Sequence, residues 1–132
     1  MATKRPTVLV VEDEVLLLQA ICTKLKLSNI DALSASSAQQ ALDYLKNLSR
    51  VPEAIWLDYY LGDSDGITFM KKLRSNKKFQ NIPVMVISNS ASPQKVQSMY
   101  KLGIKKYLIK ADHRLDEIIT DLKELIKSNK TN

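Results

Sequence analysis

The chain has 132 residues, with 20 Lys and Arg against 14 Asp and Glu, which gives a formal charge of +6. This length is typical of one domain, and an apolar share of 45% with 26% charged residues excludes a disordered chain. One cysteine excludes an internal disulfide framework, and one histidine excludes chemistry that needs two imidazoles. No apolar run approaches the ~20 residues that cross a bilayer, and no signal-peptide pattern is present. We therefore expect a cytoplasmic protein without a membrane contact.

Five β-prone runs alternate with five helical patterns along the chain. In order, strands are predicted at residues 7–11, 30–35, 54–58, 84–88 and 105–109, and helices at about 15–27, 38–45, 66–75, 93–102 and 115–126. Three of the strands are apolar without alternation, which is typical of strands covered on both faces. The alternation predicts an α/β protein with a doubly wound, five-stranded parallel sheet and five helices. No linker divides it, so we expect a single domain over residues 1–132, with a core at about 5–127 and frayed ends.

Local signals mark several helix ends. Ser37, Asp65 and Ser92 are predicted N-caps, and Gly103 is predicted to end the fourth helix. Asp63 is expected to be a turn residue rather than a catalytic one. The first helix is apolar nearly all round, so we expect it to be well buried.

The functional site of a doubly wound sheet lies at the carboxyl ends of the strands. The sequence places carboxylates after the first and third strands, a hydroxyl at the end of the fourth and a lysine after the fifth. These residues are Glu12, Asp13, Glu14, Asp58, Ser88 and Lys110. Clustered carboxylates repel one another unless a cation bridges them, and oxygen ligands at an open strand end suit Mg²⁺. The same acids would repel a phosphate that lacks a metal, which disfavours a Rossmann-type nucleotide site.

This set of side chains is suited to phosphoryl transfer. A carboxylate can attack phosphorus and form an aspartyl phosphate, while Mg²⁺ and a lysine neutralise the charge on the phosphoryl oxygens. A hydroxyl that bonds the phosphoryl group only when it is present supplies the differential contact that a switch needs.

The chain resembles a response-regulator receiver domain, the phosphoacceptor module of two-component signalling, over residues 5–127. The motifs that carry the resemblance are Val-Leu-Val-Val-Glu-Asp-Glu at 8–14, Ile-Trp-Leu-Asp at 55–58 with Asp-Gly at 65–66, Val-Met-Val-Ile-Ser at 84–88 and Tyr-Leu-Ile-Lys at 107–110. The resemblance implies a flavodoxin-like sheet with strand order 2-1-3-4-5, similar to stand-alone chemotaxis regulators.

The resemblance also implies roles for the residues at the strand ends. Asp58 would be the phosphoacceptor and a metal ligand, and Lys110 would pair with a phosphoryl oxygen. Asp13 would ligate Mg²⁺ directly, Glu12 through a water, and Tyr60 through its backbone carbonyl.

The switch residues follow from the same resemblance. Ser88 would move onto the phosphoryl group, and Tyr107 would be its aromatic rotamer partner. Tyr60 and Ser90 would influence the lifetime of the phosphate. The surface of the fourth helix, fifth strand and fifth helix would then bind a downstream partner.

Two positions depart from the family pattern. Leu61 and Gly62 stand where a proline usually follows the acceptor, and Ala111 replaces the proline that usually follows the lysine. A cis bond before a non-proline residue costs about 3 kcal/mol or more, so the Lys110–Ala111 bond is either trans or a strained cis bond.

The phosphoryl donor would be a histidine kinase or a phosphotransfer protein, and the chain would catalyse only its own phosphorylation and dephosphorylation. The alternatives are a phosphate-independent scaffold and, less favoured, an aspartate-nucleophile phosphatase, which usually has a second Asp where Tyr60 stands. The charge of +6 alone suggests a nucleic-acid binder, but no motif supports one. Basic residues such as Lys71, Arg74 and Lys78 are expected to be solvated, whereas Lys101, Lys105 and Lys106 are expected to face an acidic surface of the downstream protein.

Overall fold

The computed structural model describes residues 5–131 and contains a five-stranded parallel sheet with the order β2-β1-β3-β6-β7. The strands are β1 (Thr7–Val11), β2 (Asp31–Ala35), β3 (Ala54–Leu57), β6 (Val84–Ser88) and β7 (Lys106–Ile109). This order confirms the predicted doubly wound sheet. Two short strands that were not predicted, β4 (Tyr60–Leu61) and β5 (Ser64–Asp65), form a small antiparallel pair between β3 and the third helix.

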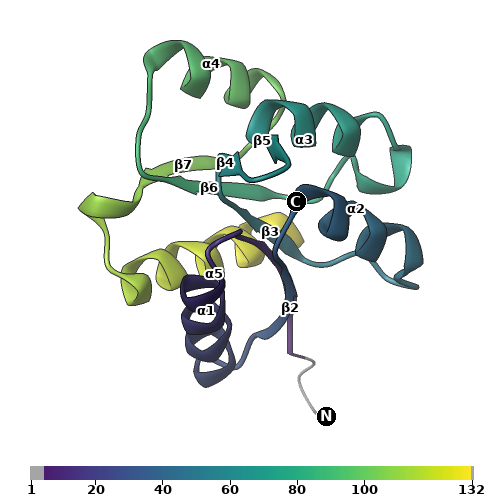
Figure 1. Cartoon of the computed structure of the whole chain (residues 1–132). Helices are drawn as coiled ribbons and strands as arrows, with labels where there is room; N and C mark the ends of the chain where they lie inside the picture. Colours follow the sequence, from purple (N-terminus) through teal and green to yellow (C-terminus); the bar gives the residue numbers. More distant parts are fainter. Residues whose placement is uncertain (1–4, 132) are drawn as a thin grey trace.

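Five α-helices cover the two faces of the sheet (Figure 1). They are α1 (Val15–Leu27), α2 (Ala38–Asn47), α3 (Gly66–Arg74), α4 (Pro93–Lys101) and α5 (Leu115–Thr131). One apolar core lies between the sheet and α1 and α5, and the other lies between the sheet and α2, α3 and α4. Both faces of the central strands are therefore buried, as their unbroken apolar runs indicate. Within residues 5–131, no helix is long and apolar enough to cross a membrane.

The predicted helix caps are confirmed. The side chains of Ser37, Asp65 and Ser92 accept hydrogen bonds from backbone N–H groups in the first turns of α2, α3 and α4. Gly103 adopts a φ of +90° just after α4, a conformation that glycine takes most easily. Asp63 has a larger role than the predicted turn, because its carboxylate accepts the backbone N–H groups of residues 38 and 39 and so caps α2 as well.

The expected burial of α1 is wrong. Only Leu18, Ile21 and Leu25 are buried, and they form one stripe of the helix. Leu16 and Leu27, near the two ends of α1, are 78% and 77% exposed. Apolar residues on every side of a helix therefore do not indicate that every side of the helix is buried.

The expected solvation of Arg74 is also wrong. Its guanidinium, at the end of α3, is half-buried and donates hydrogen bonds to four backbone carbonyls. The acceptors are the carbonyls of Leu102, Phe79, Ile82 and Gly103, at 3.0–3.2 Å. These carbonyls lie in the segments that lead into β6 and β7, so one side chain joins α3 to both segments.

The ends of the chain were predicted to fray, and residues 1–4 and 132 lie outside the described residues. Helix α5 continues to Thr131, four residues past the expected limit of the core at Lys127. The limits of the domain stay a prediction.

Candidate functional site

The carboxyl edge, where β1, β3, β6 and β7 end, brings together the side chains that the sequence predicts there. Val11 pairs with Leu57 in the parallel ladder of β1 and β3. This ladder continues past β3, because the N–H of Asp58 donates to the carbonyl of Val11 at 3.0 Å. The ladder of β1 with β2 continues likewise, because the N–H of Glu12 donates to the carbonyl of Ala35 at 3.0 Å. The backbone of the sheet therefore places two buried carboxylates next to each other, with Glu12 1% and Asp58 7% exposed.

Lys110 lies between these two carboxylates. Its Nζ is 2.9 Å from Glu12 Oε1 and 3.3 Å from Asp58 Oδ2. Asp13 is exposed at the rim, and one carboxylate oxygen from each of Glu12, Asp13 and Asp58 lies within 4.8 Å of the other two. Three carboxylate oxygens at this spacing fit a hard divalent cation such as Mg²⁺. Glu14, the third acid of the predicted set, is exposed and lies outside this group.

Burial and charge change the acid–base properties of the site. Burial and the neighbouring charge of Glu12 raise the pKa of Asp58 to about 6, although Lys110 acts in the opposite direction. Burial acts to lower the pKa of Lys110, but its hydrogen bond to Glu12 and the charges of Asp58 and Glu12 outweigh burial and raise it. At neutral pH, Asp58 is therefore mainly a carboxylate beside a charged ammonium, which is the form that can attack phosphorus.

Ser88 and Tyr107 lie on the next two strands of the sheet, β6 and β7. Ser88 is fully buried at the end of β6, and its Oγ has no hydrogen-bond partner among the residues that the structure describes. Buried hydroxyls usually have a partner, so this oxygen has an unused capacity to bond an incoming group. Tyr107 packs against the adjacent core, and its hydroxyl donates to the backbone carbonyl of Ser90 at 2.8 Å.

Sequence reasoning missed Lys95, which lies in the first turn of α4. Its Nζ bonds the hydroxyl of Tyr60 and lies 4.7 Å from the centre of the Tyr60 ring and 5.3 Å from that of Tyr59. The rings of Tyr59 and Tyr60 meet edge to face at 4.8 Å. The hydrogen bond from Lys95 lowers the pKa of Tyr60. The position of Lys95 at N3 after the Ser92 cap could have drawn attention to it, because this helix start faces the carboxyl edge.

The departure at Ala111 leaves Lys110 in place. No cis peptide bond occurs within residues 5–131, so the Lys110–Ala111 bond is trans. The chain turns there through a short 3₁₀ segment, Lys110–Asp112, and Lys110 still reaches both carboxylates.

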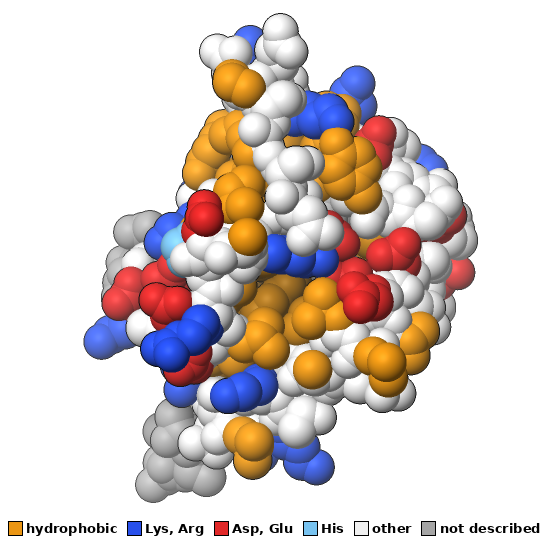
Figure 2. Space-filling view, turned by 60° about the vertical axis from the view of Figure 1, so that its left-hand side comes forward, with side chains coloured by type: hydrophobic (Ala, Val, Ile, Leu, Met, Phe, Trp, Pro, Cys, Tyr) orange, Lys and Arg blue, Asp and Glu red, His pale blue; other side chains and the backbone are white. Residues whose placement is uncertain are grey.

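An apolar hollow of about 210 Å³ adjoins Lys110. It lies between α1 and the start of α5, and its walls include Leu17, Trp56, Ile87 and Leu115. Figure 2 shows apolar side chains at the floor of a hollow that basic and acidic side chains border.

Comparison with known proteins gives consistent matches. The family model of the response regulator receiver domain matches residues 8–123. A chemotaxis protein CheY homolog of Campylobacter jejuni is 27% identical over 103 residues, which are 77% of this chain and 78% of that protein. The sensor histidine kinase CheAY of Helicobacter pylori is 29% identical over 86 residues, which are 65% of this chain but only 11% of the kinase.

A solved structure extends the similarity to nearly the whole fold. The receiver domain of the Francisella response regulator 1452 is 32% identical to the chain and superimposes with a TM-score of 0.81. The match covers 93% of this chain and 98% of that domain.

Proposed function

The chain belongs to the response regulator receiver domain family, and from this premise we propose that it is a phosphorylation-dependent signalling switch. Asp58 accepts a phosphoryl group from a histidine kinase or a phosphotransfer protein. The surface formed by α4, β7 and α5 then changes and binds a downstream protein. The observation that carries this proposal is the position of Asp58, which lies buried beside Lys110 and within one cluster with Glu12 and Asp13.

The proposed chemistry uses these side chains directly. A carboxylate oxygen of Asp58 forms a bond to phosphorus while the bond from phosphorus to the donor nitrogen breaks. The Lys110 ammonium, 3.3 Å from Asp58, neutralises charge that develops on the phosphoryl oxygens. Mg²⁺, when bound, supplies further charge neutralisation, and Glu12, Asp13, Asp58 and the carbonyl of Tyr60 are the groups that would hold it.

The proposed response begins at Ser88. A phosphoryl oxygen on Asp58 gives the buried Oγ of Ser88 the partner that it lacks in the structure described above. Movement of Ser88 changes the space beside Tyr107, whose hydroxyl bonds the backbone carbonyl of Ser90 in the loop before α4. This chain of contacts supports a change at α4 and β7 on phosphorylation.

We further propose that the phosphoryl donor rests on α1 and the apolar hollow beside Lys110. Leu16, 78% exposed near the start of α1, adds apolar surface on this side of the molecule. Because a donor histidine must reach Asp58, the donor must cover the rim of this edge.

Leu16→Ser tests the donor surface. We expect transfer from a phosphorylated histidine kinase to slow about tenfold, while phosphorylation by acetyl phosphate stays within about twofold. Leu27→Ser is the matched control, because Leu27 is 77% exposed at the far end of the same helix. Equal effects of the two variants on the kinase reaction would contradict this placement of the donor.

Intact-mass measurement tests the proposed function itself. With Mg²⁺ and acetyl phosphate, we expect an adduct of about 80 Da that Asp58→Asn abolishes. The exposed Asp43→Asn is the control and should retain the adduct. An adduct that survives Asp58→Asn, or no adduct at all, would contradict the proposal.

The same variant separates the alternatives. A scaffold that acts without phosphate would bind its partner equally well as Asp58→Asn and would not need Mg²⁺. A phosphatase would turn over small phosphoesters, whereas we propose that the chain catalyses only its own phosphorylation and dephosphorylation. A cytoplasmic location stays a prediction.

A further inference from the structure

The amino edge of the sheet, where the strands begin, carries two adjoining clefts. The first, of about 500 Å³, lies between the loop before β3, the loop before β6 and the end of α5. The second, of about 490 Å³, extends towards the start of β7. Both clefts have Asn81, Ile82 and Asn129 in their walls, so they form one continuous depression, which we name the amino-edge groove.

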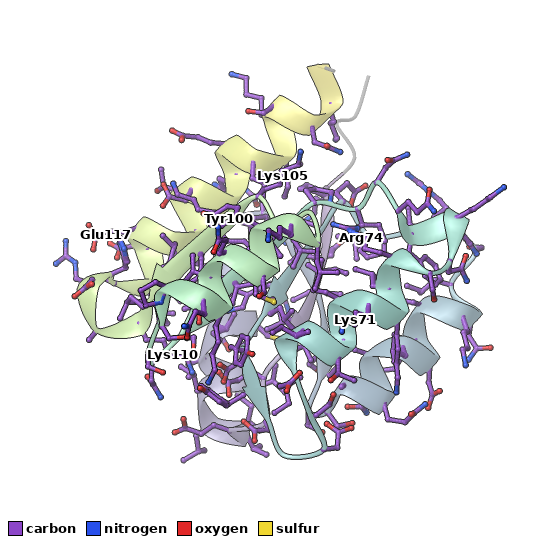
Figure 3. The ribbon with its side chains drawn as sticks, turned by 90° about the horizontal axis from the view of Figure 1, so that it is seen from above. Lys71, Arg74, Tyr100, Lys105, Lys110 and Glu117 are labelled. Atoms are coloured by element: carbon purple, nitrogen blue, oxygen red, sulfur yellow. The ribbon has the colours of Figure 1, made fainter. Side chains whose placement is uncertain are left out.

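Basic side chains border the amino-edge groove. Arg50, Lys78, Lys105 and Lys130 are exposed along it, whereas Glu53 is the single acid among the described residues that line the two clefts. Within residues 5–130, no ion pair engages Arg50, Lys105 or Lys130. Figure 3 shows Arg74 and Lys105 well away from Lys110, which marks the carboxyl edge. The groove therefore has an excess of positive charge that the protein itself does not neutralise.

The surface between these charges is apolar and amide-lined. Val51, 38% exposed, is the main apolar side chain of the first cleft, and Ile82 and Ile126, which also line it, are only 4% and 6% exposed. The amide side chains of Asn81 and Asn129 can donate and accept hydrogen bonds, as an extended peptide backbone requires. No aromatic residue lines either cleft within the described chain, so the groove lacks the stacking platform that single-stranded nucleic acids use.

We propose that the amino-edge groove binds an acidic segment of a partner protein, with an aliphatic side chain of that segment over Val51. Its carboxylates face Arg50, Lys78, Lys105 and Lys130. The charge gives specificity and speeds association, while the apolar floor favours a peptide over a polyphosphate.

This interaction is independent of phosphorylation. The four residues of β3 separate the groove from Asp58 by about 13 Å of strand. The groove also lies outside the carboxyl edge, where Ser88 and Tyr107 respond to a phosphoryl group. The proposal therefore does not rest on the proposed function.

Fluorescence anisotropy with a short labelled peptide of Glu-Asp-Leu repeats tests the proposal. We expect binding to weaken about tenfold or more in the triple variant Arg50→Glu, Lys78→Glu, Lys130→Glu. The matched control is Lys24→Glu, Lys46→Glu, Lys71→Glu, which changes net charge equally at exposed lysines outside the groove. Circular dichroism confirms that both variants are folded, and the control should bind within about twofold of the original chain.

Further probes make each outcome decisive. We expect a Glu-Asp-Ser peptide and an oligothymidylate of equal charge to bind more weakly than the Glu-Asp-Leu peptide. We expect Mg²⁺ with acetyl phosphate to leave binding unchanged, and the side-chain amide signals of Asn81 and Asn129 to shift on titration. The proposal is overturned by no binding at about 1 mM peptide, by equal weakening in the control variant, or by tighter binding of the oligothymidylate.

Discussion

Two partly buried basic side chains, Arg74 and Lys110, lie at opposite edges of the sheet, and they contact different kinds of group. Arg74, at the amino edge, donates to four neutral backbone carbonyls. Lys110, at the carboxyl edge, pairs with the buried carboxylates of Glu12 and Asp58. The carbonyls cannot change charge, so Arg74 has a fixed structural role. The carboxylates can be protonated or bind a cation, and we propose that Asp58 accepts a phosphoryl group, so the surroundings of Lys110 can change.

The largest expected effect is at Arg74. Arg74→Met leaves the carbonyls before β6 and β7 without their donors, and we expect the free energy of unfolding to fall by about 4 kcal/mol. Urea unfolding measures this change. Lys71→Met, at an exposed position of the same helix, should cost less than about 0.5 kcal/mol. The comparison fails if Arg74→Met costs less than about 1 kcal/mol, or if the folded variant is phosphorylated more slowly.

The next largest expected effect is at Lys110, and it is on the rate of phosphorylation. Lys110→Met removes the cation beside the developing negative charge, so we expect phosphorylation by acetyl phosphate to slow about 100-fold, or about 2.7 kcal/mol. Stopped-flow fluorescence of Trp56, 1% exposed beside the site, gives the rate. Lys105→Met, at an exposed position just before β7, is the control, and a rate for Lys110→Met within threefold of the unaltered chain would contradict the assigned role.

Asp58 has a smaller effect, and this effect is on the free energy of unfolding. Its pKa of about 6 lies above the ordinary value of 3.8, so the folded chain binds more protons than the unfolded chain between these values. Ionisation of Asp58 therefore destabilises the fold as pH rises from 4 to 7. We expect Asp58→Asn to be more stable by about 2 kcal/mol at pH 7, with the difference vanishing below about pH 3. Thermal melting across this range measures it, and a difference that does not depend on pH would show another origin.

The smallest expected effect is at Lys95. Lys95→Met releases Tyr60 at the rim, so we expect the pKa of Tyr60 to rise and the phosphoryl group to hydrolyse about twofold to threefold faster. Carbon NMR of the tyrosine rings follows the first change, and decay of the phosphorylated mass follows the second. Lys101→Met, at the other end of α4, should change neither; if it acts like Lys95→Met, the contact with Tyr60 is irrelevant.

The sequence predicts the carboxyl edge well for a physical reason. Apolar strand patterns are strong, and parallel strands must all end at one edge, so Glu12, Asp58, Ser88 and Lys110 could be brought together from their positions alone. The N-caps at Ser37 and Ser92 could also be predicted, because an N-cap depends on local sequence.

Features that depend on long-range packing could not be predicted. The two-residue strands β4 and β5 are too short to carry a hydrophobic period. Arg74 resembles any basic residue near a helix end, and its four acceptors come from loops that only the fold places beside it. The contact of Lys95 with Tyr60 likewise depends on how α4 packs over the acceptor loop.

Hydrogen exchange before and after phosphorylation tests most directly whether the two edges act separately. With Mg²⁺ and acetyl phosphate, we predict altered deuterium uptake in residues 58–66 and 88–95, which surround Asp58 and Ser88. We predict unchanged uptake in residues 79–83 and 102–105, which Arg74 holds at the amino edge. Equal changes at both edges, or no change around Asp58 in a fully phosphorylated sample, would contradict the account.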